Sequence, residues 1–154
     1  MDDSWFARDF LYGLPMKGVP MPYEYTIEEK DRLLIFRCSE AFLPEEISDF
    51  VRRAMLAVAD EKLSCGYGTL IIVNSKDLVP EGDISKITQL ISILESHLQG
   101  AIAIVASPDG CASLAHLITF RLFCQGCEAH AFSDESEART WLSVKRGCSR
   151  RLRL

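Results

Sequence analysis

The chain has 154 residues, of which 48% are hydrophobic and 25% charged. These are ordinary values for one folded domain, and they exclude a disordered or collagen-like chain. The net charge of −5 opposes nucleic-acid binding, which needs a basic surface. Residues 144–154 nevertheless carry five cations and no acid, which leaves 12 basic and 22 acidic side chains, a net charge of −10, on residues 1–143.

The sequence gives no sign of a membrane or secretory segment. It has no uncharged apolar run of about 18 residues, so no transmembrane helix is expected. Acidic residues stand early in the chain, and no apolar signal-peptide core follows them. We therefore expect a cytoplasmic protein, in which the six cysteines are reduced and free of metal.

Residues 1–21 form an arm rich in apolar side chains and interrupted by Pro15, Gly18 and Pro20. Such apolar content is unusual for a solvated tail. We expect the arm to pack in a homodimer or on an uncovered face of a sheet. Its large apolar residues are Trp5, Phe6, Phe10, Leu11, Tyr12 and Leu14.

The first half of the body predicts two strands and a helix. Apolar and polar residues alternate from Tyr23 to Glu28, which is the period of a half-buried strand. A polar turn separates it from a second strand over 33–37, so the two should form a hairpin. Pro44 and the two acids after it suit the first turn of a helix, which should end before Gly66.

The second half alternates strands with helices. The apolar runs 69–73 and 101–105 predict central strands covered on both faces, and 128–132 predicts a last strand. Asp83, Ser107 and Ser133 are suitable helix caps. The second and third helices should end at Gly100 and Gly126, and the fourth should run through Ala138, Trp141 and Leu142. The third helix should bury Leu114, Leu117, Ile118 and Leu122.

This order predicts an α/β domain over residues 22–143, between the arm and a basic tail at 144–154. Its five-stranded sheet is mainly parallel, in the order β-β-α-β-α-β-α-β-α, with the first strand antiparallel.

Motifs for chemistry are scarce. The sequence has no P-loop, GxGxxG or GxSxG pattern. Cys124 and Cys127 form a CxxC pair and are weak candidates for a metal or redox site. They fall at the end of a helix, where the dipole opposes thiolate formation. We therefore expect no cofactor, no metal and no catalytic residue.

The strand pair, the three β-α units and the C-terminal stretch from Phe132 through Ala138 to Trp141 and Leu142 resemble the STAS family, which includes anti-sigma-factor antagonists. The similarity is greatest to its small stand-alone bacterial members and covers about residues 23–143. Switching members of that family carry an Asp-Ser-Ser/Thr-Gly signature at the start of the helix after the central strand. The matching stretch here is 80–86, which lacks the signature. Ser85 is the residue there that could be phosphorylated, in the first turn of the helix.

The resemblance implies a sheet with sequential strand order. Such a sheet has no reversal in strand order and so lacks the usual cofactor crevice. Its crossover helices should gather on one face and leave the other under-covered. We expect a non-enzymatic regulatory or protein-interaction module that associates with itself and with a protein partner. The alternatives are a protein that binds a small apolar ligand or lipid, and an unrecognised enzyme.

Overall fold

The computed structural model describes residues 23–38, 44–74, 81–107 and 112–152, and of residues 81 and 146–152 only the backbone. The predicted arm at 1–21 lies outside these residues. The elements are β1 (Tyr23–Glu28), β2 (Leu33–Cys38), α2 (Pro44–Ala59), β3 (Gly68–Val73), α3 (Glu81–Leu98), β4 (Ile102–Ala106), α4 (Ala112–Cys124), β5 (Ala129–Phe132) and α5 (Glu135–Leu152).

The five strands form one sheet in the order β1-β2-β3-β4-β5. β1 pairs antiparallel with β2, and the other neighbours pair parallel. The predicted fold class and the sequential strand order are therefore confirmed. β3 and β4 are buried at every residue, as their continuous apolar sequences predict.

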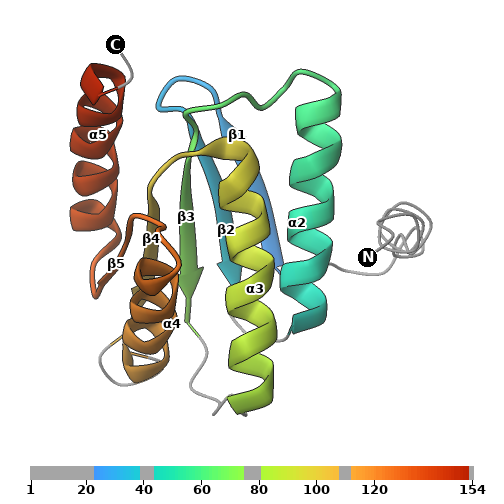
Figure 1. The fold of residues 1–154 in the computed structure, drawn as a ribbon, viewed down its shortest axis with the longest axis vertical. Helices are drawn as coiled ribbons and strands as arrows, with labels where there is room; N and C mark the ends of the chain where they lie inside the picture. The colour runs from blue at the N-terminus through green and yellow to red at the C-terminus, as the bar shows by residue number, and fades with distance from the viewer. Residues whose placement is uncertain (1–22, 39–43, 75–80, 108–111, 153–154) are drawn as a thin grey trace.

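One face of the sheet carries the larger core. α2, α3 and α4 bury apolar stripes there, because each is the crossover between two strands and right-handed crossovers place their helices on the same face. Figure 1 shows α3 in front of the strands, between α2 and α4. At the centre of this core, Phe36 packs between Tyr23 and Phe50, with ring centroids 4.8 and 5.0 Å away.

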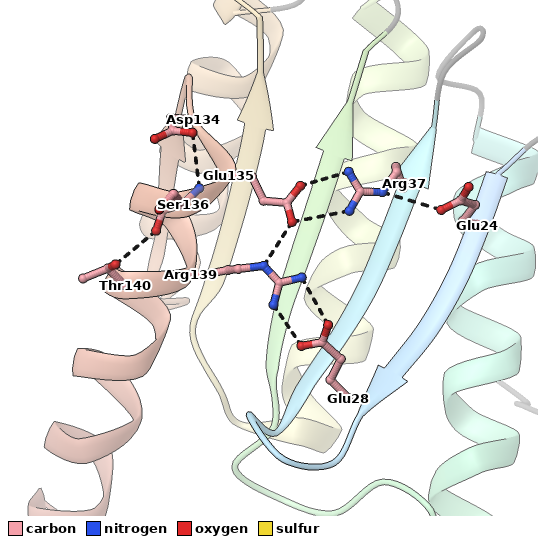
Figure 2. A network of polar contacts seen from close by, with 8 residues as sticks. All are labelled: Glu24, Glu28, Arg37, Asp134, Glu135, Ser136, Arg139 and Thr140. Carbon is pink, nitrogen blue, oxygen red and sulfur yellow. Dashed lines mark hydrogen bonds and ion pairs between the residues drawn. The ribbon is translucent and has the colours of Figure 1, made fainter.

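The opposite face is not left open, contrary to the sequence-based expectation. α5 covers it over β3, β4 and β5, and Ala138 and Leu142 are buried against Leu70 and Ala103. α5 can pack there because it does not connect two of the five strands, so it is not a crossover in this sheet and the handedness rule does not apply to it. Over β1 and the end of β2 this face carries Glu24, Glu28 and Arg37 (Figure 2), while Leu33 and Ile35 of β2 are buried in its core.

Two helix bounds differ from the prediction and a third agrees with it. α3 begins at Glu81, so Asp83 lies inside its first turn and is not its cap. α4 ends at Cys124, where Gly126 has a φ of +89° and supports the turn, as expected. α5 continues to Leu152, because Lys and Arg are good helix formers and no proline stops it. None of the helices in the described ranges is both long and apolar enough to span a membrane.

Candidate interaction surface

Exposed apolar side chains gather on α4. Of the four large hydrophobic residues exposed in the described part of the chain, three are on this helix: Leu117, Phe120 at 64% and Phe123 at 69% exposed. The opposite side of α4 is buried through Ala115, Ile118 and Leu122. α4 is therefore apolar on both its sheet side and its solvent side, which is typical of a helix that contacts a further partner.

Arg121 lies on the side of α4 that faces α3. Its Nη1 donates a 3.0 Å hydrogen bond to the hydroxyl of Ser85 on α3. Leu117 lies one turn before Arg121 and so shares the side of α4 that faces α3. Phe120 points away from the sheet beside them. Ser85, Arg121, Leu117 and Phe120 together form what we call the α3–α4 surface.

The structure changes the setting of Ser85. Since α3 begins at Glu81, Ser85 is its fifth residue and lies beyond the first-turn N–H groups that are free to bind an anion. The predicted first-turn position is therefore wrong. Ser85 is exposed, and Arg121 supplies the positive charge that the helix terminus does not.

Cys124 and Cys127, the CxxC pair, differ in their exposure to solvent. Cys124 is exposed at the last residue of α4, while Cys127 is buried. Burial raises the pKa of the Cys127 thiol, and the nearby Glu95 carboxylate, 3.7 Å from its sulfur, raises it further. Both effects oppose a reactive thiolate. Within the described ranges, no group of three or more His, Cys, Asp and Glu residues could hold a metal ion.

A ladder of ion pairs crosses the face of the sheet beside α5. Figure 2 shows Arg37 on β2 between Glu24 and Glu135, with Nη1 of Arg37 2.9 Å from Oε1 of Glu135. Arg139 binds the same Glu135 and reaches Glu28 on β1 through two nitrogens, at 2.9 and 3.2 Å. The ladder therefore ties the start of α5 to the β1–β2 hairpin.

The ladder explains the shifted pKa values of its members. The hydrogen bond from Arg139 lowers the pKa of Glu28, and the bond from Arg37 lowers the pKa of Glu135. Glu28 and Glu135 raise the pKa of Arg139 in return. These shifts arise from structural ion pairs, so they do not indicate an acid–base catalyst.

A second polar cluster joins α2 to β1. Asp49 accepts hydrogen bonds from the Tyr23 hydroxyl and from Arg52, and lies 3.2 Å from Nε of Arg53. Arg52 is almost fully buried, and its Nε has no hydrogen-bond partner. Burial raises the pKa of Tyr23 to about 12, so its hydroxyl stays protonated and able to donate. This cluster also has a structural explanation.

A shallow groove of about 330 Å³ runs between α5 and the turn after β1. Its volume is at the lower end for small-molecule sites. Its lining is more polar than apolar, which does not suit an apolar ligand. The lining residues are Asp31, Leu33, Arg139, Thr140, Ser143 and Val144.

The helical period of the sequence predicts that Leu117 is buried, and it assigns no role to Phe120 or Phe123. Leu117 is in fact 37% exposed. One signal in the sequence could have found this surface: residues 112–124 contain a single charged side chain, Arg121, so the helix lacks a charged face. The pairing of Arg121 with Ser85, 36 residues earlier, had no such signal.

Comparisons of the chain with protein-family models, with curated proteins and with solved structures found no match.

Proposed function

We propose that the protein is a non-enzymatic interaction module of STAS type, which binds a partner protein through the α3–α4 surface. The observation that carries this proposal is the solvent-facing side of α4, where Phe120 is exposed beside Arg121. The sequential order of the five strands is the order that the STAS resemblance implies. We also propose that the chain associates with itself, through the outer edge of β5 and not through the α3–α4 surface.

The side chains of the α3–α4 surface indicate which kind of partner it would bind. Leu117 and Phe120 offer an apolar contact, and α4 has no acidic side chain to repel a negative charge. A partner that presents apolar side chains beside a carboxylate would bury the first against α4 and pair the second with Arg121. Aromatic residues flanked by arginine are typical of the centre of protein–protein interfaces.

Ser85 gives this surface a means of regulation. A phosphate on its hydroxyl would place a charge of about −1.5 to −2 beside the Arg121 guanidinium. The phosphate would then compete with the carboxylate of the partner for that cation. Phosphorylation of Ser85 is therefore proposed to weaken partner binding.

The apolar-ligand alternative has less support. It needs an apolar cavity, whereas the 330 Å³ groove beside α5 is lined mainly by polar side chains.

Affinity capture with matched variants tests the proposal. The full-length chain is immobilised, exposed to lysate of its source cells, and compared with Phe120→Ser, Arg121→Gln and Ser85→Glu. Val144→Ser is the control, because Val144 is 58% exposed but lies on α5. We expect at least one protein to bind both the wild type and the control. When that protein is titrated against the other three variants, its affinity for each should be at least about tenfold lower than for the wild type. Equal binding by all variants would exclude the α3–α4 surface.

A further inference from the structure

The outer edge of β5 carries backbone groups that could pair with another strand. β5 is the last strand of the sheet, and no described strand pairs with its outer side. The N–H of Ile102 on β4 donates to the carbonyl of Glu128 at 2.8 Å. Alternate residues of a parallel strand bond to the same neighbour. The N–H and C=O groups of Ala129 and Ala131 therefore point outward, to the free edge.

The edge of β5 lacks charged side chains and prolines. Proteins guard exposed edges with short strands, charged side chains, prolines or a covering element. Of the protections that lie in its own sequence, β5 has only its short length of four residues. β1, the other outer strand, carries Glu24 and Glu28. β5 reads Ala-His-Ala-Phe and has no Asp, Glu, Lys, Arg or Pro. Of the two outer strands, β5 is thus the one suited to accept another strand.

An exposed aromatic ring lies beside this edge. Phe123 follows Arg121 by two residues, which is about 200° around the helix axis. Because Arg121 faces α3, Phe123 faces the other way, toward β5, and it is 69% exposed. Figure 1 shows α4 and β5 on the same side of the molecule, away from β1 and α2.

We infer that a second copy of this chain pairs with β5 in an antiparallel, two-fold symmetric arrangement. One register pairs every outward N–H and C=O group of Ala129 and Ala131. It places Ala129 opposite Ala131 of the second copy and Ala131 opposite Ala129 of the second copy, which gives four backbone hydrogen bonds. His130 then lies opposite His130 of the second copy as a non-hydrogen-bonded pair. The inference rests on the proposed self-association and does not depend on the partner site.

The spacing of the elements fits this dimer. α4 packs on β5 and, less extensively, on β4. Adjacent strands are about 4.8 Å apart, so a helix centred between β4 and β5 lies about 2.4 Å inside the edge strand. Across a β5–β5 junction the two α4 axes would therefore be about 10 Å apart, which is within the range for packed helices. The two Phe123 rings would fill the space between them.

The area involved indicates a weak dimer. An exposed Phe123 contributes about 140 Å² per copy, from a ring of roughly 200 Å². Stable interfaces bury about 1,200–2,000 Å² in total, so the rings alone are too small and the strand pairing must contribute. The dimer is expected in the micromolar range, so it should be measured from about 1 to 300 μM.

Cysteine cross-linking tests the register directly. In the proposed pair the two Cα atoms at position 130 are about 4.5 Å apart, within the range for a disulfide. Oxidation of the full-length His130→Cys variant by oxygen with copper–phenanthroline should give a covalent dimer within minutes. Ser136→Cys, exposed on α5, is the matched control, and the wild type shows any bands from native cysteines. A His130→Cys band no stronger than that of the control would overturn the register.

Sedimentation velocity tests the contribution of α4. Phe123→Glu should weaken dimerisation at least tenfold, since it places a charge between the two helices. Val144→Glu should leave it unchanged, because Val144 lines the groove beside the β1–β2 turn, on the other side of α5 from β5. Equal association of both variants would exclude this interface. A monomeric wild type that still binds a partner protein through Phe120 and Arg121 would reject self-association and leave the proposed partner site on the α3–α4 surface standing.

Discussion

Leu142 and Trp141 are buried to different extents where α5 packs on the sheet. The sequence predicts that both face the sheet and that Trp141 is a buried core anchor. In the structure Leu142 is 3% exposed, whereas Trp141 is half-buried and packs beside Phe132 and under Lys145. The difference arises because Trp141 lies over the outer strand β5, where no further strand covers its outer side.

Alanine substitutions should show this division. Leu142→Ala removes a buried side chain and should lower the free energy of unfolding by about 2–5 kcal/mol. Trp141→Ala removes a half-buried ring and should cost about 2 kcal/mol, roughly half the value for a buried aromatic residue. Urea denaturation followed by circular dichroism measures both. A larger loss for Trp141→Ala than for Leu142→Ala would contradict the burial described for α5.

At the level of single residues, the sequence predicts apolar contacts better than polar ones. The alternation from Tyr23 to Ile27 places its apolar residues correctly against α2. The bonds from Arg37 to Glu135 and from Arg121 to Ser85 join residues 98 and 36 positions apart. Long side chains can reach many partners from one position, so periodicity does not specify such pairs.

Among the elements, α5 and the β1–β2 hairpin are joined by the ion-pair ladder. Its central carboxylates, Glu135 and Glu28, are 31% and 32% exposed, so solvent screens them in part. Exposed ion pairs contribute about 0.2–1 kcal/mol, and a bidentate network lies toward the upper end of that range. The ladder therefore adds to the docking of α5 but does not replace the apolar contacts of Ala138 and Leu142.

The lowered pKa values of Glu28 and Glu135 give this contribution a pH dependence. A carboxyl group with a lowered pKa in the folded state stabilises the fold above its unfolded value, about 4.3, and loses that effect as the pH falls through the folded value. We predict that Glu135→Gln lowers the free energy of unfolding by about 1 kcal/mol at pH 7, and by much less near pH 3.

Urea denaturation at a series of pH values measures this difference. Glu137→Gln serves as the control, because Glu137 is an exposed carboxylate on the same helix. Parallel stability curves for Glu135→Gln and the wild type, from pH 7 to pH 3, would contradict a role for the ladder in docking α5.

The elements themselves were largely predictable. Helical periods, the alternation in β1 and the continuous apolar runs of the central strands identify the five strands and four helices of the described ranges in order, because burial on a sheet determines those patterns. The placement of α5 was not predictable from periodicity. A helix that follows the last strand can pack on either face, and only its contacts with Leu70 and Ala103 decide between them.

For the whole molecule, the position of α5 limits which part of the sheet the N-terminal arm could cover. The arm was expected to cover an open sheet face or to form a dimer, and α5 already covers that face over β3 to β5. The proposed dimer uses β5 and α4, at the opposite edge of the sheet from β1, which the arm precedes. Removal of the arm should therefore lower the stability of the folded chain and leave its self-association nearly unchanged.

Deletion of residues 1–20 tests this separation. Six large apolar side chains in the arm are costly to leave in water, so their contacts should add to the stability of the folded chain. We predict a lower melting temperature for the deletion variant, by several degrees for each 1 kcal/mol lost. Its dimer dissociation constant should stay within about threefold of the wild-type value, because the contacts proposed for the dimer are made by β5 and α4. A deletion that abolishes the dimer would instead assign self-association to the arm, and an unchanged melting temperature would show that the arm contributes nothing to folding.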